Sequence, residues 1–409
     1  MLTGKPAAHY DIVVVGGGLV GASFALHLDQ SLADTECSVL VVEAVSPSDH
    51  KNQPSFDARS TALSWGSRTI FEQMALWSEL KHVVTPIESI QVSDQGHLGT
   101  TELDHTEHSV EALGYVVENR ELGVLLNHRL EHSSRLQLLA PALISAIQPQ
   151  ADGMSLSVQH QDAELQIDAS LVVLADGGRS PICQQLGIEQ SSDNYQQSAV
   201  ITNIAVQNAH NNKAFERFTE FGPLAVLPLA TFEGQARCSL VWTVESGAEE
   251  ELLHCEDAEF IERLSSLFGN RLGRILKVGQ RFAYPLALSE AREQIRPGLV
   301  LLGNVAHTLH PVAGQGLNLS LRDCAALVQV LCAGMAAEQS PGDMSVLQSY
   351  LDSRLTDQRE SILFTDQMTR LFSSALVSKV LTRKAGLLSL DLVPGLRKEF
   401  ARRAMGTLS

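Results

Sequence analysis

Positive charge and paired cysteines are both scarce in this sequence. Its 409 residues include 30 Lys and Arg against 47 Asp and Glu, which gives a formal net charge of −17. A chain this acidic repels the phosphates of nucleic acid, so we expect no nucleic-acid partner. The six cysteines form no C-x-x-C pair, which argues against a zinc site and against a redox dithiol. Free thiols in a reducing cytosol fit this pattern best.

Targeting signals and long apolar runs are missing as well. The N-terminus has no basic start followed by an apolar run and a small-residue cleavage site, so no signal peptide is predicted. No apolar stretch reaches the roughly 18 residues that a membrane span needs. We therefore expect a cytoplasmic protein that is soluble, or at most peripheral at the inner face of a membrane.

Candidate metal ligands are sparse too. His105 and His108 lie three residues apart in a polar segment, but no further ligand cluster accompanies them, so no metal site is predicted. The chain does have ample material for a core, because 44% of its residues are hydrophobic and only 19% are charged. A length of 409 residues favours two closely packed domains.

The stretch from Gly16 to Gly21 has glycines in the spacing G-x-G-x-x-G. The apolar run Tyr10 to Val15 predicts a buried strand before it, and a helical pattern follows it, which is the context that dinucleotide binding requires. Gly16 permits a tight turn, Gly18 lets the backbone approach a pyrophosphate, and Gly21 allows the helix to pack on the strand. The motif predicts a bound dinucleotide and leaves NAD and FAD open.

An acidic residue follows the motif at a suitable distance. Leu19 and Val20 complete the glycine motif and are candidate cofactor-binding residues with it. A second apolar strand, Ser38 to Val42, ends at Glu43. A carboxylate about twenty residues beyond the glycines is placed to accept hydrogen bonds from an adenosine ribose.

Two arginines and one turn are further candidates. Arg59 precedes a segment with helical spacing of apolar residues, and Arg120 begins another amphipathic helix. Arg59 could reach a pyrophosphate, although a solvated surface arginine explains it equally well. The apolar strand Leu171 to Ala175 runs into Asp176-Gly177, a pair that is usually an ordinary turn. Because parallel sheets bind ligands at the carboxyl ends of their strands, this pair becomes a candidate site.

A change of pattern marks a second domain. From Ala199 to Leu286, short alternating segments predict an antiparallel sheet with one helix near Ala258 to Phe268. An antiparallel sheet often has one solvated face and covers something with the other. We interpret this region as a substrate-binding lid inserted in the nucleotide-binding domain, which resumes at Leu299.

The stretch from residue 299 to residue 323 organises the rest of the chain. An apolar strand ends at Gly303, a loop follows, and a helix is predicted from Leu317. The amides of Leu317 and Asn318 would lie at a helix N-terminus, where the dipole favours negative charge. The loop contains His310-Pro311 and Gly314-Gln315-Gly316. Such glycines let amides approach a flat ligand closely, but a loop between two packed elements is an equally good explanation of this stretch alone.

The end of the chain departs from the acidic average. After Asp323 the sequence predicts helix, and from Leu371 onward basic residues outnumber acidic ones. The basic residues are Lys379, Arg383, Lys384, Arg397, Lys398, Arg402 and Arg403. A packing helix with a solvated basic face explains them, and a membrane-surface or partner contact is the alternative.

The glycine motif, Asp176-Gly177 and Gly303 to Asn318 together resemble a known family. They are similar to the single-component aromatic hydroxylases that use FAD and a nicotinamide cofactor, the group that includes p-hydroxybenzoate hydroxylase. Gly303-Asn304, where most relatives carry Gly-Asp, resembles the branch of ubiquinone-pathway hydroxylases. Four other runs support that branch: Phe56-Asp57-Ala58-Arg59-Ser60, Ala214-Phe215-Glu216-Arg217-Phe218-Thr219, Gly222-Pro223-Leu224-Ala225 and Thr308-Leu309-His310-Pro311.

The resemblance implies an α/β fold class. A Rossmann-like FAD-binding domain of the p-hydroxybenzoate hydroxylase type would carry an inserted antiparallel-sheet substrate domain and C-terminal helices. The FAD-binding domain would comprise residues 1–80, 105–190 and 287–350. The substrate domain would comprise residues 81–104 and 191–286, and a helical segment would span 351–409.

The resemblance also implies roles for single residues. Glu43 would hold the adenosine ribose, and Arg59, next to Ser60, would contact the pyrophosphate side of FAD together with Arg120. The remaining candidates are Asp176 and Gly177 in a motif shared by FAD and NAD(P)H, Asn304 at the ribityl chain, and Pro311, Gly314, Gln315, Gly316, Leu317 and Asn318 along the isoalloxazine. Cys183 departs from the family pattern, which has Arg there, and this puts binding of the nicotinamide cofactor in doubt.

The implied activity is hydroxylation of a polyprenyl phenol ring in ubiquinone biosynthesis. NADPH or NADH would reduce the bound FAD, and O2 would supply the oxygen atom through a flavin C4a-hydroperoxide. His310 and Pro311 are the catalytic candidates, since His310 is the nearest titratable group by sequence and the Pro311 carbonyl could orient the phenol. A polyprenyl tail favours contact with a membrane or a quinone-biosynthesis complex. A flavin oxidoreductase that inserts no oxygen and a non-catalytic FAD-bearing subunit of such a complex stay open as alternatives.

Overall fold

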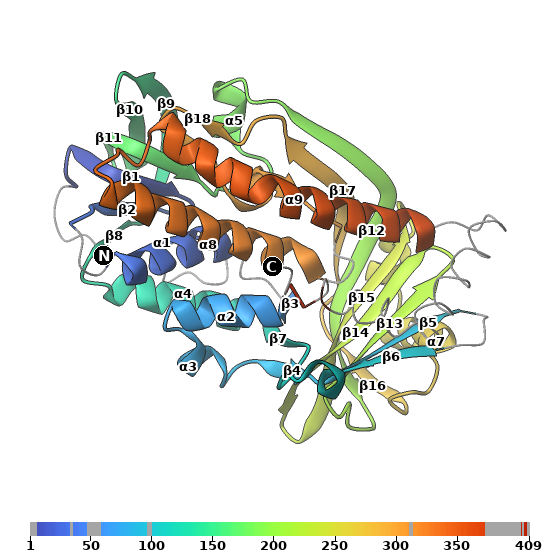
Figure 1. Ribbon diagram of the computed structural model, residues 1–409. Helices are drawn as coiled ribbons and strands as arrows, with labels where there is room; N and C mark the ends of the chain where they lie inside the picture. The colour runs from blue at the N-terminus through green and yellow to red at the C-terminus, as the bar shows by residue number, and fades with distance from the viewer. Residues whose placement is uncertain are drawn as a thin grey trace.

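A computed structural model describes residues 6–32, 36–46, 59–95, 100–310 and 314–372, together with Arg402, Met405 and Gly406. The chain builds an α/β half on a largely parallel sheet and a second half on an antiparallel sheet (Figure 1). Long helices lie across the α/β half and point toward the antiparallel strands. The two halves thus meet along a boundary, here called the seam.

The parallel sheet is the core of the α/β half. Its strand order is β18-β19-β11-β1-β2-β8, and β10 and β9 extend it by antiparallel pairing on β11. β2 and β19 are buried at every residue, because a parallel sheet is covered on both faces. The bounds are β1 His9–Val15, β2 Val39–Val42, β8 Leu136–Leu139, β9 Ala142–Gln150, β10 Gly153–His160, β11 Ala163–Leu174, β18 Ile295–Arg296 and β19 Leu299–Leu301.

Helices cover this sheet and share one apolar core with it. α1 packs on α4 and α8, and α8 also packs on α2 and α9. Phe24, Leu126 and Leu327, from three different helices, belong to a single buried cluster with the sheet. The bounds are α1 Leu19–Ser31, α2 Trp65–Gln73, α3 Trp77–Leu80, α4 Asn119–His132, α5 Pro181–Gln185, α8 Gln315–Ala336, α9 Met344–Phe372, and the short 3-10 helices η1 His105–His108 and η2 Gly303–Val305.

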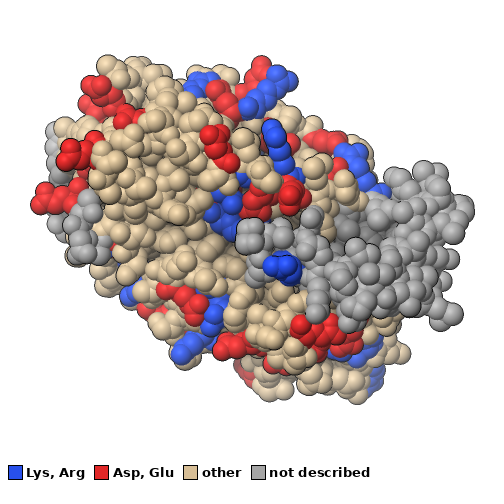
Figure 2. Space-filling model, in the orientation of Figure 1, with Lys and Arg blue, Asp and Glu red and all other residues tan. Residues whose placement is uncertain are grey.

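α8 corrects the expectation that no stretch could span a membrane. By length and composition this helix of 22 residues is apolar enough, with a mean hydropathy of 1.4 over its best window. Half of that window is buried inside the protein. Its packing against α1, α2 and α9 accounts for the apolar residues, as expected for a core helix. In the view of Figure 2 the surface over α8 shows almost no charged side chains, and both signs are interspersed around it.

The antiparallel sheet has the order β20-β17-β12-β15-β14-β13-β5-β6, with β16 paired to β12. Two helices, α6 Glu249–His254 and α7 Asp257–Phe268, cover one face, where Trp242 meets Phe260 edge to face. We call the opposite face, which is turned to the α/β half, the inner face. The bounds are β5 Ser89–Asp94, β6 Thr100–Asp104, β12 Gln190–Val206, β13 Lys213–Thr219, β14 Gly222–Phe232, β15 Gln235–Glu245, β16 Ile275–Val278, β17 Phe282–Ala291 and β20 His307–Thr308.

A small third sheet changes one expected element. Its strands are β3 Ser60–Ser64, β7 Gly114–Glu118 and β4 Thr85–Ile87, in the order β3-β7-β4. The predicted helix after Arg59 is therefore wrong at its start, because Leu63 lies in β3, opposite Tyr115. The helix begins only at Trp65, where the Ser64 hydroxyl accepts a hydrogen bond from the Ser67 amide.

Other differences from the predicted elements concern length. β11 is a strand of 12 residues that begins at Ala163, eight residues before the predicted start of this strand at Leu171. β12 begins at Gln190, nine residues before the predicted start of the antiparallel sheet. α8 begins at Gln315 instead of Leu317. The antiparallel strands come from residues 89–104, 190–291 and 307–308, and the predicted domain boundaries stay a prediction.

Candidate functional site

Five parallel strands, β19, β11, β1, β2 and β8, end at one edge of the sheet, and the first predicted motif lies there. The Gly16 amide donates to the Val42 carbonyl over 2.9 Å, so the glycine loop starts between the ends of β1 and β2. Gly16 has φ of +100°, and a Cβ there would lie 2.5 Å from the Ala175 carbonyl oxygen. A Cβ on Gly21 would lie 1.9 Å from the Gly16 carbonyl oxygen. Only glycine allows this approach of α1 to the sheet.

α1 presents an open N-terminus at this edge. Gly18 is its N-cap residue, no side chain caps the helix among the described residues, and the first turn has no acidic residue. The amides of Leu19 and Val20 lie in that turn, where the helix dipole stabilises an anion such as a phosphate. The first turn is thus suited to a pyrophosphate.

Glu43 lies directly against the glycine loop. One oxygen of its carboxylate accepts a hydrogen bond of 2.5 Å from the Gly17 amide, and the other accepts one of 2.8 Å from the Val45 amide. These bonds hold the carboxylate at the end of β2, next to the motif, as predicted for a ribose-binding residue. Its contact with a ribose remains a prediction.

The Asp176-Gly177 turn meets the same loop. A Cβ on Gly16 would lie 3.1 Å from the Asp176 Cα atom. The Asp176 Oδ2 atom accepts a hydrogen bond of 2.7 Å from the Ser180 hydroxyl, while Oδ1 is buried with no partner among the residues that the structure describes. Burial raises the pKa of this carboxyl to about 6, although the bond from Ser180 lowers it. An orphaned buried oxygen at this edge fits a ligand hydroxyl or amide.

Cys183, the departure from the family pattern, is a packing residue. It lies in α5, only 2% exposed, and its amide donates to the Ser180 hydroxyl over 3.3 Å. Burial raises the pKa of its thiol, so the side chain stays neutral and cannot replace an arginine charge.

The third motif packs on the first. A Cβ on Gly303 would lie 3.0 Å from a methyl carbon of Val20 in the first turn of α1. Asn304 is exposed, and its carbonyl accepts a hydrogen bond of 3.1 Å from the Thr308 hydroxyl. A Cβ on Gly178 would touch that hydroxyl at 3.2 Å. Asn304 therefore lies beside the Asp176-Gly177 turn, and the three predicted motifs meet in space.

The start of α8 is a second open helix N-terminus. Its N-cap residue Gly314 has φ of +60°, no described side chain caps it, and the first turn has no acidic residue. A Cβ on Gly316 would meet nothing within 4 Å, so space lies in front of it. Leu317 packs partly against the main core, and Gln315 is buried. This arrangement fits the predicted stabilisation of negative charge on a flat ligand.

Asn318 has a structural role that the sequence did not reveal. Its side-chain oxygen accepts hydrogen bonds from the Ser64 amide (2.8 Å) and the Ser67 hydroxyl (2.7 Å). Its amide nitrogen donates to the carbonyls of Ala62 (2.8 Å) and Gly314 (2.7 Å). All four bonds that an asparagine side chain can make are thus used, so only the Asn318 backbone is available to a cofactor.

Arg59, Ser60 and Arg120 lie together at the seam. The Asn119 amide donates to the Arg59 carbonyl over 2.9 Å, which places Arg59 beside Arg120, an exposed residue in the first turn of α4. The Arg59 guanidinium lies 4.7 Å from the ring centre of Tyr284 on β17. The Ser60 hydroxyl is buried without a partner among the described residues. Contacts of these residues with a pyrophosphate stay a prediction.

Polar contacts fasten the two halves across the seam. Glu118, at the end of β7, accepts hydrogen bonds from Asn203 on β12 (3.1 Å) and from Arg237 on β15 (3.2 Å). Tyr195 on β12 donates to Asp366 on α9 over 3.0 Å. The inner face is thereby held against the start of α4 and against α9.

Of the two predicted catalytic residues, His310 and Pro311, the structure describes His310. Pro311 lies outside the described residues. His310 is 1% exposed, and its ring meets that of Tyr195 edge to face with centres 5.2 Å apart. Burial lowers the pKa of His310 to about 4, so it is neutral at pH 7 and a weak proton acceptor. These surroundings favour a packing role, and its catalytic role stays a prediction.

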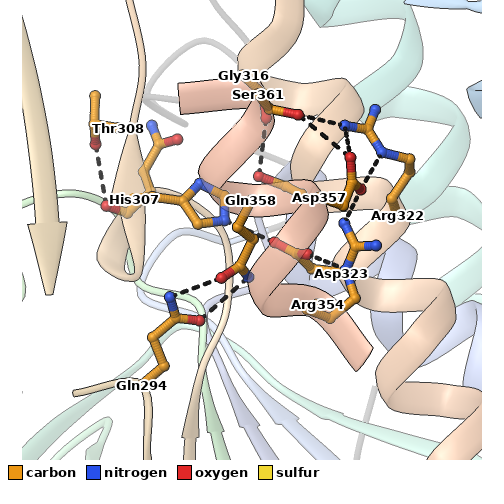
Figure 3. A network of polar contacts seen from close by, with 12 residues as sticks. Gln294, His307, Thr308, Gly316, Arg322, Asp323, Arg354, Asp357, Gln358 and Ser361 are labelled. Carbon is orange, nitrogen blue, oxygen red and sulfur yellow. Dashed lines mark hydrogen bonds and ion pairs between the residues drawn. The ribbon is translucent and has the colours of Figure 1, made fainter. Parts of the chain in front are cut away.

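A buried ionic network supports the third motif from behind (Figure 3). The Asp323 carboxylate on α8 is bonded to His307 at 2.7 Å and to Arg354 of α9 at 2.6 Å. Asp357, on the next turn of α9, pairs with both Arg354 and Arg322. Burial alone would raise the pKa of Asp323, but His307 and Arg354 outweigh it and the pKa is lowered. The network ties the loop after Gly303 to both helices.

These observations match the chemistry of FAD. Two open helix N-termini suit a pyrophosphate and a negatively charged ring, and orphaned oxygens on Ser60 and Asp176 suit ligand donors. The FAD-binding domain family matches residues 9–362 of this chain. The chain belongs to this family. FAD is therefore its cofactor, as the sequence predicted.

Similar proteins agree with this membership. The chain is 34% identical to ubiquinone hydroxylase UbiL of Rhodospirillum rubrum, over 100% of this chain and 92% of that protein. It is 29% identical to 3-demethoxyubiquinol 3-hydroxylase of Escherichia coli, over 99% of this chain and 100% of that protein. The crystal structure of p-nitrophenol 4-monooxygenase PnpA from Pseudomonas putida superposes with a TM-score of 0.75, at 18% identity and 97% coverage of both chains. The predicted family and fold class are confirmed.

Proposed function

We propose that this FAD-binding protein is a monooxygenase that hydroxylates a polyprenyl phenol ring in ubiquinone biosynthesis. The observation that carries the proposal is the open N-terminus of α8 at the seam, beside the inner face of an antiparallel sheet. Relatives whose names describe ubiquinone hydroxylation support the substrate class, because they match nearly the whole chain. The 2-octaprenyl-6-methoxyphenol hydroxylases are the type that we expect it to resemble in activity.

The chain's own residues then have three tasks. When bound, FAD accepts a hydride from NADPH or NADH and passes the electrons to O2. The first turns of α1 and α8 hold the negative charges of this cofactor. Asp176 and Ser60 offer polar atoms for its hydroxyl and amide groups. The inner face excludes water from the reacting ring and fixes its orientation.

The overall reaction balances with one oxygen atom in each product. A ring carbon exchanges its C–H bond for C–OH, and the second oxygen atom of O2 leaves as water. NAD(P)H supplies the two electrons and becomes NAD(P)+, and one proton is consumed.

Coupled consumption and product analysis test this proposal. The purified FAD-loaded protein should consume NADH or NADPH and O2 when a short-chain polyprenyl methoxyphenol is added, and mass spectrometry should detect a ring with one added hydroxyl. NAD(P)H oxidation that yields no hydroxylated ring would support a flavin oxidoreductase that inserts no oxygen. Bound flavin without any turnover would support a non-catalytic subunit.

We also propose that substrate is received at a membrane surface or from a quinone-biosynthesis partner. Each buried CH2 group contributes about 0.8 kcal/mol, so a long polyprenyl tail does not leave lipid freely. The basic residues Lys379, Arg383, Lys384, Arg397 and Lys398 are candidates for this contact, and they lie outside the described residues.

The test must spare the end of the chain, because Met405 is buried and its carbonyl accepts a hydrogen bond of 2.9 Å from the Gly66 amide. Changing those five residues to Gln, rather than truncating the chain, should reduce sedimentation with anionic vesicles. Unchanged sedimentation and unchanged turnover of vesicle-borne substrate would refute this proposal.

A further inference from the structure

Glu216 on β13 places a carboxyl group on the inner face of the antiparallel sheet. Successive strand residues point to opposite faces. Phe215 packs edge to face on Phe268 of α7, with ring centres 5.4 Å apart, so Phe215 and Arg217 belong to the outer face. Ala214, two residues before Glu216, belongs to a buried cluster with Ile87 and Val116 of the small sheet. Glu216 therefore points toward the α/β half.

The neighbours of Glu216 on this face are apolar. Val92 on β5 and Ala225 on β14 lie directly opposite it. The same row continues with Val241 on β15 and Ile201 on β12. Within the described chain, no residue forms a hydrogen bond or ion pair with the Glu216 carboxyl. A carboxyl in such surroundings destabilises the fold when it is charged, so a functional reason for it is expected.

Nearby charges do not neutralise this carboxyl. Arg217, the adjacent cation in the chain, points to the other face and donates to the Ser93 hydroxyl over 3.4 Å. Asp94, on the inner face of β5 and diagonal to Glu216, has the same sign of charge. Ala214 and Phe218 on the same strand and Ala225 on β14 have no charge, and neither do the three residues of β4. Arg237, a cation on β15, forms an ion pair with Glu118.

The Glu216 side chain is half-buried. Burial raises the pKa of this carboxyl to about 7, with no opposing charge. A group in this state can both release and accept a proton near neutral pH.

Contacts through Ala62 connect the strand that holds Glu216 with the start of α8. Asn318 donates to the Ala62 carbonyl, and a Cβ on Gly314 would lie 3.2 Å from the Ala62 Cβ. Ala62 packs against the same apolar cluster that contains Ala214. Glu216 follows Ala214 on the same face at about 6.6 Å along the strand. A ring held between the first turn of α8 and the inner face would lie within reach of Glu216.

We propose that Glu216 is the base that takes the proton of the substrate's phenol hydroxyl. This inference rests on the proposed function, because it assigns a residue to ring hydroxylation. The O–H bond breaks, its proton passes to the Glu216 carboxylate, and the electron pair spreads to the ortho and para carbons. One of these carbons forms the new C–O bond to an oxygen atom from O2, with NAD(P)H as the reductant. The ring hydrogen then leaves as a proton, and Glu216 returns its proton to the original oxygen.

Substitution of Glu216 tests the role. Glu216→Gln keeps the shape and removes the base, so kcat/KM for hydroxylation at pH 7 should fall by about 10²-fold or more. Glu216→Asp should retain part of the activity because it keeps a carboxyl. The control Glu220→Gln changes an exposed glutamate just after β13 and should behave as the wild type. All three variants should retain full FAD content.

The pH profile separates a base from a structural residue. In the wild type, kcat/KM should rise through pH 7 as Glu216 ionises, whereas in Glu216→Gln it should rise only near the ionisation of the free phenol, about pH 10. A fluorinated substrate whose hydroxyl ionises below pH 7 should reduce the difference between wild type and Glu216→Gln to a few-fold. Equal losses with both substrates would overturn the proposal.

The ionisation state of a bound phenol can be measured without turnover. A chromophoric phenol analogue should show the absorbance of its phenolate when it binds the FAD-loaded wild type at pH 7, and not when it binds Glu216→Gln. Identical spectra in the two proteins, or a neutral phenol in the wild type, would overturn the proposal for Glu216. If the phenolate forms as expected but no hydroxylated ring appears, the inference stands and the proposed function fails.

Discussion

A carboxyl group whose pKa rises on folding weakens the folded state at high pH. The pKa of Glu216 is raised to about 7 and that of Asp176 to about 6, above the values near 4 of an unfolded chain. The stability that these groups contribute is fully present below about pH 4 and is lost as the pH rises through 6 and 7. At neutral pH both carboxyl groups therefore destabilise the folded state, which is common for residues at functional sites.

Glu216→Gln should therefore stabilise the FAD-free protein at pH 8. We expect a gain of roughly 1–3 kcal/mol in the free energy of unfolding, because the variant no longer buries an unpaired charge. At pH 4 the two proteins should be about equally stable, since Glu216 is then protonated. Urea unfolding at the two pH values measures the difference, and a gain of the same size at both would contradict the raised pKa.

Asn318 gives a second prediction for a single residue. Asn318→Ala removes four hydrogen bonds and leaves buried donors and acceptors in β3 and α2 unpaired, so it should cost about 2–4 kcal/mol of stability. The control Gln329→Ala lies on the exposed side of the same helix and should change stability by less than about 0.5 kcal/mol. Similar midpoints of urea unfolding for both variants would show that the bonds of Asn318 are not needed.

The sequence predicted the roles of single residues only where the segments involved are adjacent in the chain. Gly16, Gly18 and Gly21 were predictable because strand, turn and helix are contiguous in the chain. The role of the Asn318 side chain was not, because its partners Ser64 and Ser67 lie about 250 residues away in sequence. Glu216 stood in a recognised run, but its face and its apolar row depend on pairing with β5 and β14.

At the scale of elements, two helix N-termini determine where charge can be held. Both α1 and α8 begin at a glycine, and no described side chain caps either helix, so the first turn of each is suited to a bound anion. The sequence predicted both helices, but it placed the start of α8 two residues late and extended the helix after Arg59 into β3. A short apolar run fits the residue spacing of a helix as well as that of a strand. Only the pairing with β7 shows that residues Ser60–Ser64 form a strand.

Two glycine variants should separate folding from cofactor binding. Gly21→Ala puts a Cβ 1.9 Å from the Gly16 carbonyl oxygen, so it should lower both stability and FAD affinity. Gly316→Ala has free space in this structure and a better helix former, so it should raise the stability of the FAD-free protein by up to about 1 kcal/mol. It should nevertheless weaken FAD binding, at least about tenfold by flavin fluorescence titration, because its Cβ enters the cofactor's space. Undiminished affinity would remove Gly316 from the site.

The ionic network between α8 and α9 gives a further prediction for these elements. Asp323→Leu leaves the Arg354 charge buried without one of its partners, and we expect a loss of about 3–5 kcal/mol. Asp352→Leu, on the exposed side of α9, is the matched control and should be nearly neutral. Thermal unfolding of both variants decides, and equal melting temperatures would contradict a structural role for the network.

At the scale of the whole molecule, the site exists only because two halves of the chain meet. The α/β half supplies the glycine loop, Asp176 and the start of α8, and the antiparallel half supplies the inner face. The sequence predicted both kinds of sheet from apolar periodicity and motif spacing. It could not give the seam itself, because contacts such as Glu118 with Arg237 or Arg59 with Tyr284 join segments far apart in sequence.

In the proposed reaction, the FAD-loaded protein inserts one oxygen atom from O2 into a phenol ring. The most direct test supplies NAD(P)H, a short-chain polyprenyl methoxyphenol and oxygen-18 gas to the purified protein in ordinary water. We expect mass spectrometry to detect a product with a single heavy oxygen atom on the ring. A product that takes its new oxygen from water, or no ring hydroxylation with FAD fully bound, would contradict it.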